Sequence, residues 1–564
     1  MKKFFTTADN SSARSQGRPE LDESASRDSL DQPSSAGPPP DETTRLLPNR
    51  IDSNYNGYLS PDDPAVSPYN LFSVRAAHYF TGFLLILTSI WWILLLVSLF
   101  VTPPGFETRG SPFTAFSYAT VAVTSLAVCL LFFAAPSKSV RIITGIVALF
   151  LFINTIITAA VERTRHEEGW VGITSVTWAL AMAVWTIIAD RTVQWGKREE
   201  EERLTGRPES RRTLLEWIEV SVSSIILIIL CVVTALLTCT LILRSLDAGL
   251  APLGKRYWVD GNKYEIHVYC HGSKSKEPLP TVLFEGGDDP VENGLWQFAQ
   301  SAVQNGSINR YCFADRPGLG WSDTAPSPFS AGQATEALSE ALAHAGETGP
   351  WVLVGAGVGS IYSRVFSSRH GTEIEGLLLL DPLHEDLLDR VGASGRGFWL
   401  WLRGVLSPLG VDRVPGALFK GRTREDRVWG RAAYQNSKTI FAKLQESLVA
   451  NSLTKRDAIT SRAIQYQDTP LALISSGNQI KKDKVWEDKQ KDLSKLTHTL
   501  LSWDIVADAP HEIWRTLEGR ELIEKRLKKL VRRPAKHPGT KEASEAVEAK
   551  EEVATDEENV GEAN

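Results

Sequence analysis

The chain has 564 residues, of which 43% are hydrophobic and 23% are charged, and its formal net charge is -6. This length exceeds that of one compact domain, and neither the charge balance nor an isoelectric point near 6 favours a protein that binds nucleic acid. We therefore expect no nucleic acid among its partners.

The chain begins with a polar arm. Residues 1 to about 70 are rich in Ser, Pro, Asp and Gly and show little apolar periodicity. Such a segment buries too little apolar surface to offset its ordering entropy, which predicts a disordered cytosolic arm over 1–75. Within it, Glu42 precedes the pair Leu46 and Leu47 at a spacing that resembles the acidic dileucine signals bound by adaptor coats. The alternative is two leucines in a tail.

Five apolar runs follow the arm, and each is long enough to cross a bilayer, which takes roughly 20 residues. They cover about 79–102, 113–135, 140–161, 170–189 and 215–243. Five such runs in succession are not explained by buried core helices, so we predict an all-α transmembrane region over 76–246 in contact with the lipid bilayer. At depth these runs carry only Asn154 and several Ser and Thr as polar groups, which favours an anchor over a transporter.

Basic residues in the short loops predict the orientation of the spans. The first loop holds only Arg109, whereas the fourth holds Arg191, Lys197, Arg198, Arg203, Arg207, Arg211 and Arg212. The second and fourth loops are therefore expected in the cytosol with the N-terminus. Five crossings then place the C-terminal domain in a lumen or outside the cell. There, Asn305 in an Asn-Gly-Ser triplet is a glycosylation candidate.

From about residue 256 the pattern changes to strands that alternate with helices. The segments "KYEIHVYC", "PTVLFEGG", "RYCFAD", "PWVLVGAGVG", "IEGLLLLDP", "PLALISSG" and "HTLLSWDIV" are expected strands. This alternation predicts a mostly parallel sheet with helices on both faces. Cys270 and Cys312 fall on two of these strands. Because five cysteines do not form a disulfide framework, we expect two buried free thiols here.

Five landmarks in this region occur in the order typical of the α/β-hydrolase superfamily. They are "FEGG", "DRPGLGWSD", the glycine-bounded turn at 355–359, "LLLLDP" and the histidine of "VADAPHEIW". The region therefore resembles that superfamily, which implies an α/β-hydrolase-like domain over 256–530 with a helical lid at about 383–469. The resemblance also implies a nucleophilic serine in a G-x-S-x-G turn, a histidine, a carboxylate and an oxyanion loop.

The nucleophile position departs from that pattern. Gly355 and Gly359 flank the turn as the superfamily requires, but Gly357 stands where the serine is expected and has no side chain to attack a carbonyl. Ser360 lies one turn into the following helix, displaced by roughly 5 Å, which is too far for attack. His511 matches the superfamily's histidine.

The remaining catalytic positions are vestigial candidates. Asp381 and Asp483 each follow an expected strand, and either could orient the histidine. Gly286 and Gly287 would form the oxyanion loop. Two carboxylates come directly after them and oppose a developing negative charge.

These features predict a non-catalytic pseudo-hydrolase that needs no cofactor or metal and binds a ligand or partner, such as a lipid or small ester under the lid. Two alternatives are a membrane-bound lipid or ester hydrolase with another nucleophile, and an acid–base enzyme that uses His511 and a carboxylate. The order of spans and domain resembles uncharacterised fungal integral membrane proteins. An endomembrane, the vacuole or endosome, is favoured over the mitochondrial or plasma membrane.

The chain is expected to end in a solvated basic helix, "RELIEKRLKKLVRR", followed by a disordered acidic tail over 531–564. A basic helix with apolar residues at helical spacing could instead rest on an anionic membrane surface.

Overall fold

The computed structural model describes residues 66–106, 108–206, 213–273 and 279–533. The dileucine residues Glu42, Leu46 and Leu47, and nearly all of the expected acidic tail, lie outside the described residues. All of the described residues belong to one compact unit, Leu59–Asn564.

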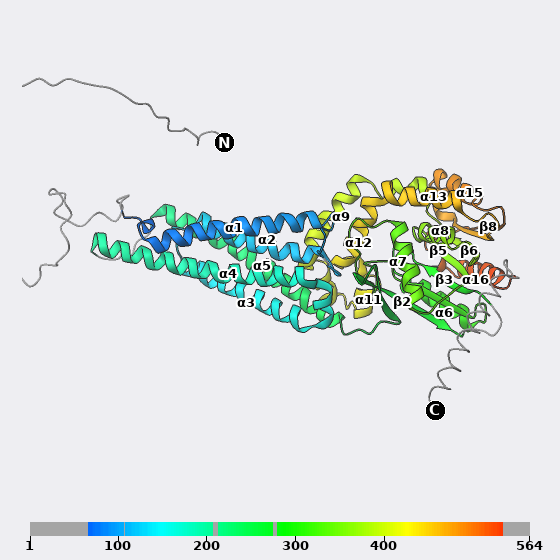
Figure 1. The fold of residues 1–564 in the computed structure, drawn as a ribbon, viewed down its shortest axis with the longest axis horizontal. Coiled ribbons are helices and arrows are strands. Elements are labelled where there is room, and N and C mark those ends of the chain that lie inside the picture. Colours follow the sequence, from blue (N-terminus) through cyan, green and yellow to red (C-terminus); the bar gives the residue numbers. More distant parts are fainter. Residues whose placement is uncertain (1–65, 107, 207–212, 274–278, 534–564) are drawn as a thin grey trace, which may run out of the picture. The chain divides into compact units, whose positions relative to one another are not determined.

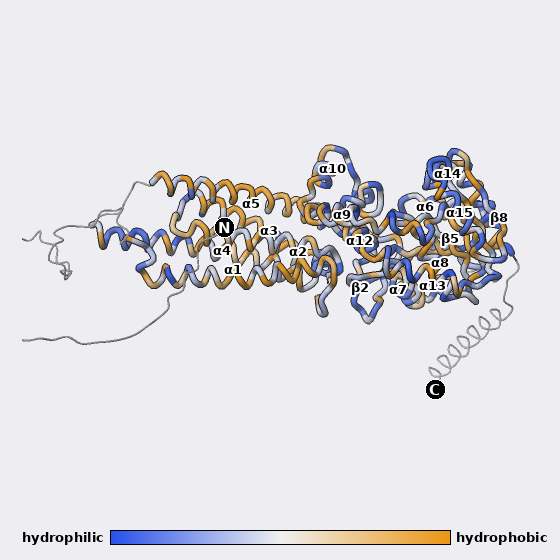
Figure 2. The backbone as a smooth tube through the Cα atoms, turned by 90° about the horizontal axis from the view of Figure 1, so that it is seen from above, coloured by the Kyte–Doolittle hydropathy of each residue, from blue (hydrophilic) through white to orange (hydrophobic). Residues whose placement is uncertain are grey.

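Among the described residues, five helices are long and apolar enough to cross a membrane. They are α1 (Phe72–Ser98), α2 (Pro112–Leu131), α3 (Lys138–Ala160), α4 (Glu162–Thr205) and α5 (Leu214–Asp247), and they run alongside one another (Figure 1). Hydrophobic residues dominate α1 and α5 along most of their length (Figure 2). The five expected spans are therefore confirmed. Inside α4, Gly169 has a φ of 59°, which kinks the helix just before the expected span.

Tryptophan side chains join α1 to α4 inside the bundle. The indole of Trp185 donates a hydrogen bond to Thr81 at 3.0 Å, and that of Trp178 donates to Thr88 at 3.0 Å. The two pairs are seven residues apart on antiparallel helices, so they lie about two turns apart along the same contact between α1 and α4. Hydrogen bonds between membrane helices of this kind each contribute about 0.6 kcal/mol on average.

An eight-stranded sheet forms the centre of the C-terminal domain in the described part of the chain. Its strands are β1 (Lys255–Val259), β2 (Tyr264–Gly272), β3 (Thr281–Glu285), β4 (Arg310–Ala314), β5 (Trp351–Ala356), β6 (Ile374–Leu380), β7 (Leu471–Ser476) and β8 (Leu500–Val506). The order is β1-β2-β4-β3-β5-β6-β7-β8. Only the pairs β1–β2 and β2–β4 are antiparallel. This is the expected mostly parallel, α/β-hydrolase-like sheet.

Successive side chains of a strand point to opposite faces of the sheet, and in this sheet both faces carry buried side chains. Helices therefore cover both faces. On one face, α6 (Leu295–Gln304) and α16 (Leu517–Val531) pack against the sheet. On the other face lie α7 (Ala331–His344) and α8 (Gly359–Arg369). The expected terminal basic helix is α16, and its Leu527 is fully buried in the core. Its apolar side is therefore committed to the sheet and not to a membrane surface.

The segment between β6 and β7 is the expected helical lid. It contains α9 (Ser394–Leu406), α10 (Arg413–Phe419), α11 (Arg424–Val428), α12 (Ser437–Val449) and α13 (Lys455–Ile464). After β7 come α14 (Gly477–Lys482) and α15 (Lys484–Leu493). The remaining short helical turns are Pro68–Asn70, Glu385–Arg390, Ser407–Leu409, Ala433–Gln435, Ala450–Thr454 and Ile513–Arg515.

The expectation of two free thiols on the strands was wrong. Cys270 and Cys312 form a disulfide between β2 and β4, where they are direct partners in the antiparallel register. The cysteines lie 42 residues apart in sequence, so only the pairing of β2 with β4, skipping β3, brings them together. Cys129, Cys231 and Cys239 are free.

Replacing both bridged cysteines, Cys270→Ala with Cys312→Ala, should lower the free energy of unfolding by roughly 2–4 kcal/mol, because the bridge restricts the unfolded chain. Thermal unfolding of the purified full chain measures this loss, with Cys239→Ala as the matched single-thiol control. Alkylation of the denatured wild type should block three cysteines without reductant and five with it. Five blocked cysteines in both samples would contradict the bridge.

Candidate functional site

The turn between β5 and α8 has the geometry of a nucleophile elbow. Gly357 lies at its apex with a φ of 50°, a left-handed backbone conformation that residues other than glycine rarely adopt. A Cβ atom on Gly355 would lie 2.7 Å from Ser363 Oγ, and one on Gly359 would lie 2.1 Å from the Gly286 carbonyl oxygen. The turn therefore leaves no room for a side chain at either flanking glycine.

The imidazole of His511 lies against the apex of this turn. A Cβ atom built on Gly357 would be 2.8 Å from His511 Nε2 and 3.3 Å from its Cε1. The α-carbon of Gly287, from the loop after β3, would be 3.9 Å from the same Cβ. The histidine and the oxyanion loop thus converge on the place where the superfamily has its serine, and glycine supplies no atom there.

Asp381 holds the histidine in place from the other side. His511 Nδ1 lies 2.6 Å from Asp381 Oδ2, so Nδ1 carries the proton that is donated to the carboxylate and Nε2 faces Gly357. Asp381 is fully buried, and its Oδ1 accepts hydrogen bonds from the Trp486 indole at 2.9 Å and from the Ser476 backbone N–H at 3.1 Å. Three donors therefore fix this carboxylate at the end of β6.

The second candidate acid has a different job. Asp483 accepts hydrogen bonds from the backbone N–H groups at the start of α15 and pairs with Arg390 at 2.6 Å. Of the two carboxylates that the sequence left open, the structure brings only Asp381 to His511.

The environment of His511 shifts its proton affinity. Burial alone lowers the pKa of the imidazole, but the hydrogen bond to Asp381 and the negative charges of Asp381, Asp288 and Glu512 outweigh burial, so the pKa is raised above its ordinary value of 6.5. The folded state holds this proton more tightly than the unfolded chain does. The resulting stabilisation is present below pH 6.5 and is lost as the pH rises through the folded-state pKa.

Ser360 does not replace the missing nucleophile. Its hydroxyl donates to the Gly357 carbonyl oxygen at 2.6 Å and accepts from the Leu383 backbone N–H at 3.1 Å. The side chain is fully buried and ties the elbow to the chain after β6. It therefore supports the turn and does not face His511, as expected from its position.

A buried arginine under the oxyanion loop escaped the sequence analysis. Arg316 donates to the carbonyl oxygens of Gly286 and Gly287, each at 2.5 Å, and to Glu285 at 3.1 Å. Burial raises the pKa of Glu285 to about 7, although the arginine opposes that rise. The arginine belongs to the motif "DRPGLGWSD", which was the available signal.

The two carboxylates after the oxyanion loop have partners of their own. Asp288 is largely exposed and lies 3.5 Å from the Lys443 ammonium group of α12. Lys443 lowers the pKa of Asp288. Asp289 accepts a hydrogen bond from Asn293 at 2.7 Å. Their charges are thus partly compensated, and the opposition to an oxyanion is weaker than the sequence suggests.

The glycosylation candidate Asn305 is exposed at the end of α6, and its side-chain amide donates to Glu524 at 3.2 Å. Glycosylation at this residue stays a prediction.

One buried cluster has the residue types of a metal site. His267, Glu292 and Asp315 are all buried and place one ligand atom each within 4.8 Å of one another. However, His267 Nε2 accepts a hydrogen bond from the Gly254 N–H at 3.2 Å, so the proton is on Nδ1, which faces Asp315 at 3.0 Å. A protonated nitrogen cannot ligate a metal ion, so His267 and Asp315 are better explained as a buried hydrogen-bonded pair.

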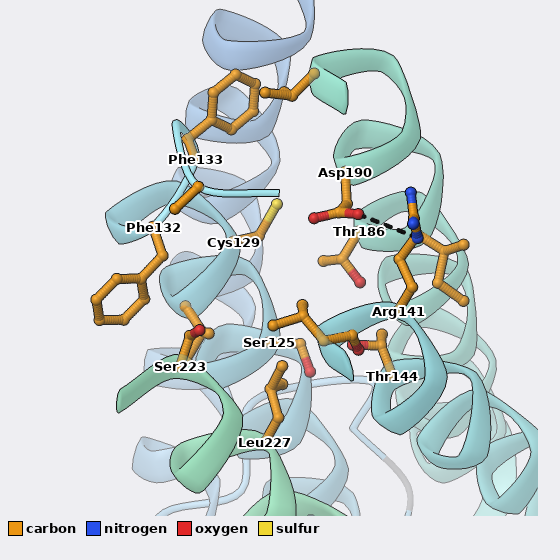
Figure 3. A pocket seen from close by; sticks show the side chains of 15 residues that line it. Ser125, Cys129, Phe132, Phe133, Arg141, Thr144, Thr186, Asp190, Ser223 and Leu227 are labelled. Atoms are coloured by element: carbon orange, nitrogen blue, oxygen red, sulfur yellow. Dashed lines mark hydrogen bonds and ion pairs between the residues drawn. The ribbon is translucent and has the colours of Figure 1, made fainter. Parts of the chain in front are cut away.

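A polar cavity also lies between the membrane helices, close to the loop that joins α2 and α3 (Figure 3). Arg141 and Asp190 form an ion pair at 3.5 Å beside Thr186 and Ser125. The cavity measures about 30 Å³, which is room for a water molecule and too little for an organic ligand. The elbow is therefore the stronger candidate site.

Comparison with known proteins shows relatives of this chain in fungi and a family model that covers the membrane region. Residues 42–270 match the family described as "Region of unknown function (DUF2417)". An uncharacterized protein of Schizosaccharomyces pombe is 33% identical over 521 residues, which cover 87% of this chain and 96% of that protein. The chain belongs to the same family as that protein. The DUF2417 region spans the five membrane helices and reaches into β2.

A second relative is an uncharacterized vacuolar membrane protein of Saccharomyces cerevisiae, 24% identical over an alignment of 573 positions, gaps included, which covers 82% of this chain and 88% of that protein. The resemblance to fungal integral membrane proteins is thus confirmed. Among solved structures, an α/β hydrolase from a deep-sea metagenome library is similar to this chain, with 14% identity and a TM-score of 0.37. The match covers 50% of this chain and 98% of the hydrolase. A carboxylesterase of Nitrososphaera gargenis is another similar structure, with 13% identity, coverage of 49% of this chain and 98% of its own, and a TM-score of 0.37.

Asp381→Asn should lower the pKa of His511, because burial then acts without the carboxylate's opposing charge. The full chain is treated with diethyl pyrocarbonate over a range of pH, and peptide mass spectrometry measures the modified fraction of His511. The pH at which half of His511 is modified reports this shift. The exposed His498 serves as the internal reference for reagent activity. An unchanged midpoint for His511 would show that Asp381 does not control its proton.

Proposed function

We propose that this protein is a membrane-anchored pseudo-hydrolase, whose C-terminal domain binds a lipid-like ligand beneath its lid without turning it over. The observation that carries the proposal is that the residue at the elbow apex is Gly357. A Cβ atom built on this glycine would lie 2.8 Å from His511 Nε2, so the histidine faces a position without a side chain. Acyl transfer on this fold begins with an oxygen at that point. The glycines around it and the His511–Asp381 pair retain the site's shape.

The position of the lid supports a ligand taken from the bilayer. Phe113 at the start of α2 fills the space beside Gly404 of α9, where a Cβ would lie 2.1 Å from its ring. Thr240 near the end of α5 fills the space beside Gly410, just before α10. The lid helices therefore rest against the ends of two membrane-spanning helices.

The lid also exposes large apolar side chains at this level. Trp399 of α9 is 66% exposed and Phe419 of α10 is 84% exposed. Apolar side chains flanked by cations on a short amphipathic helix are typical of elements that lie in a membrane interface. An exposed apolar lid beside the bilayer suits a lipid or small apolar ester better than a soluble polar substrate.

We further propose the vacuolar membrane as the location, with the C-terminal domain in the lumen. Relatives named vacuolar membrane proteins support the organelle. The loop charges support the orientation, and the Cys270–Cys312 bridge supports an oxidising compartment on that side. The division into an arm over 1–75, a membrane region over 76–246 and a hydrolase-like domain over 256–530 belongs to this proposal, as does an adaptor coat at the dileucine pair.

The intact His511–Asp381 pair favours one second candidate, an acid–base enzyme that activates a water molecule or a substrate proton. An imidazole with a raised pKa and a free Nε2 edge could accept such a proton. This candidate requires turnover by the wild type that His511→Ala abolishes, whereas the pseudo-hydrolase has none to abolish.

Gly357→Ser in the full chain should create a fluorophosphonate-reactive side chain at 357 and raise hydrolysis of p-nitrophenyl butyrate at least tenfold over wild type. The new hydroxyl would lie beside His511 once the imidazole has moved away from the added Cβ, which would otherwise stand 2.8 Å from its Nε2. Adding Ala356→His should preserve this gain. Gly357→Ala supplies the same Cβ without the hydroxyl, and Gly357→Ser with His511→Ala supplies the hydroxyl without its base. Equal hydrolysis by wild type and Gly357→Ser would refute the missing nucleophile as the cause of inactivity.

Lipid contact at the lid has its own test. In nanodiscs that contain a diazirine-bearing phosphatidylcholine, irradiation should label peptides of α9 and α10 in the wild type. Phe398→Ser with Trp399→Ser should reduce that labelling several-fold, because it removes exposed apolar area. Val485→Ser, also half exposed but on α15, is the matched control. Equal labelling in all three proteins would contradict lid contact with lipid.

A further inference from the structure

A cavity unrelated to the elbow lies where α4 and α5 meet the C-terminal domain. It measures about 230 Å³, far more than the small cavity inside the membrane bundle. Its wall carries five cationic side chains and two carboxylates, namely Arg163, Arg244, Arg256, Arg413 and Lys438 with Glu167 and Asp247. A wall of this composition attracts anions.

A larger open cleft adjoins the cavity. The cleft measures about 670 Å³ and shares Arg163 and Arg256 with the cavity wall. It adds Arg165 and His166 from α4, and Ser245 from the last turns of α5. The neighbouring Leu246 is 46% exposed, so the apolar surface of α5 continues to this point. This cleft therefore lies at the edge of the apolar membrane region.

Lys438 is the least compensated cation in the cavity wall. Its ammonium group donates to the backbone carbonyl oxygens of Gly320 at 3.0 Å and Ser322 at 2.9 Å, and not to a carboxylate. Burial lowers the pKa of Lys438 to about 8, and the charge of Arg163 adds to that lowering, although Glu167 opposes it. An anion in the cavity would stabilise this charged lysine.

The two arginines contributed by the C-terminal domain are also undercompensated. Arg413 is only 4% exposed and pairs with Asp247 at 2.6 Å, yet its buried Nε has no hydrogen-bond partner among the described residues. Burial lowers the pKa of Arg413, and that of Arg256 as well. Arg256 pairs with Glu265 at 3.6 Å, but it shares this carboxylate with Arg163, which lies at the same distance.

Charged groups just behind the wall balance the cations in number but do not line the cavity. They add one cation, Arg427, which pairs with Asp247, and four carboxylates, Glu168, Glu265, Asp315 and Asp323. The lining itself keeps five cations against two carboxylates, so the positive charge is concentrated on the cavity side.

We propose that this cavity is a binding site for a phosphate group, carried by an anionic lipid headgroup or free in solution. Guanidinium groups present planar pairs of donors that match phosphate oxygens, and buried cations bind them more strongly than exposed ones. The site lies outside the elbow and does not depend on whether the hydrolase-like pocket is inert.

The test uses the full chain in phosphatidylcholine nanodiscs, titrated with inorganic phosphate against sodium chloride of equal ionic strength. Phosphate should raise the Tm of the wild type saturably. Arg256→Gln and Lys438→Met should each weaken the apparent affinity at least tenfold. Arg390→Gln, an exposed arginine paired with Asp483, should respond as the wild type does. Since Lys438 is buried, Arg256→Gln, at a side chain 28% exposed, is the decisive variant.

A second arm identifies the source of the phosphate group. Nanodiscs with phosphatidic acid and no inorganic phosphate should stabilise the wild type more than Arg256→Gln if the headgroup occupies the site. Stabilisation by phosphate alone assigns the site to a soluble anion, and stabilisation by either probe supports the proposal. Absence of both effects, or equal effects on wild type and Arg256→Gln, overturns it.

Discussion

The tight turn between β5 and α8 constrains the rest of the site. No Cβ fits at Gly355 or Gly359, because the chain after β3 and the start of α8 pass too close. At the apex, the imidazole of His511 occupies the space beside Gly357 that a serine side chain needs. The turn, the histidine and Asp381 together therefore keep the shape of a hydrolase centre around a position without a reactive atom.

The membrane region is built into the C-terminal domain and does more than tether it. Asp247 at the end of α5 pairs with Arg413 and Arg427 of the lid, and all three side chains are buried. Removing one partner of such a buried group typically costs about 3–5 kcal/mol. At the start of α4, Arg163 pairs with Asp323, the last residue of the motif "DRPGLGWSD". Buried ion pairs thus tie the membrane helices directly to the lid and to the hydrolase-like sheet.

Local sequence patterns predicted whatever depends on local geometry. Apolar length predicted the spans, strand–helix alternation predicted the parallel sheet, and the resemblance to the superfamily pointed to the turn around Gly357. Features set by strand pairing were less accessible. Asp381 and Asp483 both follow strands, and only the folded positions distinguish them. The Cys270–Cys312 bridge depends on β4 lying next to β2, a neighbour relation that residue spacing does not encode.

The most direct test of an inert elbow is to treat the wild-type full chain in nanodiscs with a fluorophosphonate probe and map every adduct by peptide mass spectrometry. The absence of a nucleophilic oxygen at the apex predicts no adduct in the C-terminal domain above that of heat-denatured protein. A stoichiometric adduct on any side chain of that domain, lost in His511→Ala, would contradict the account.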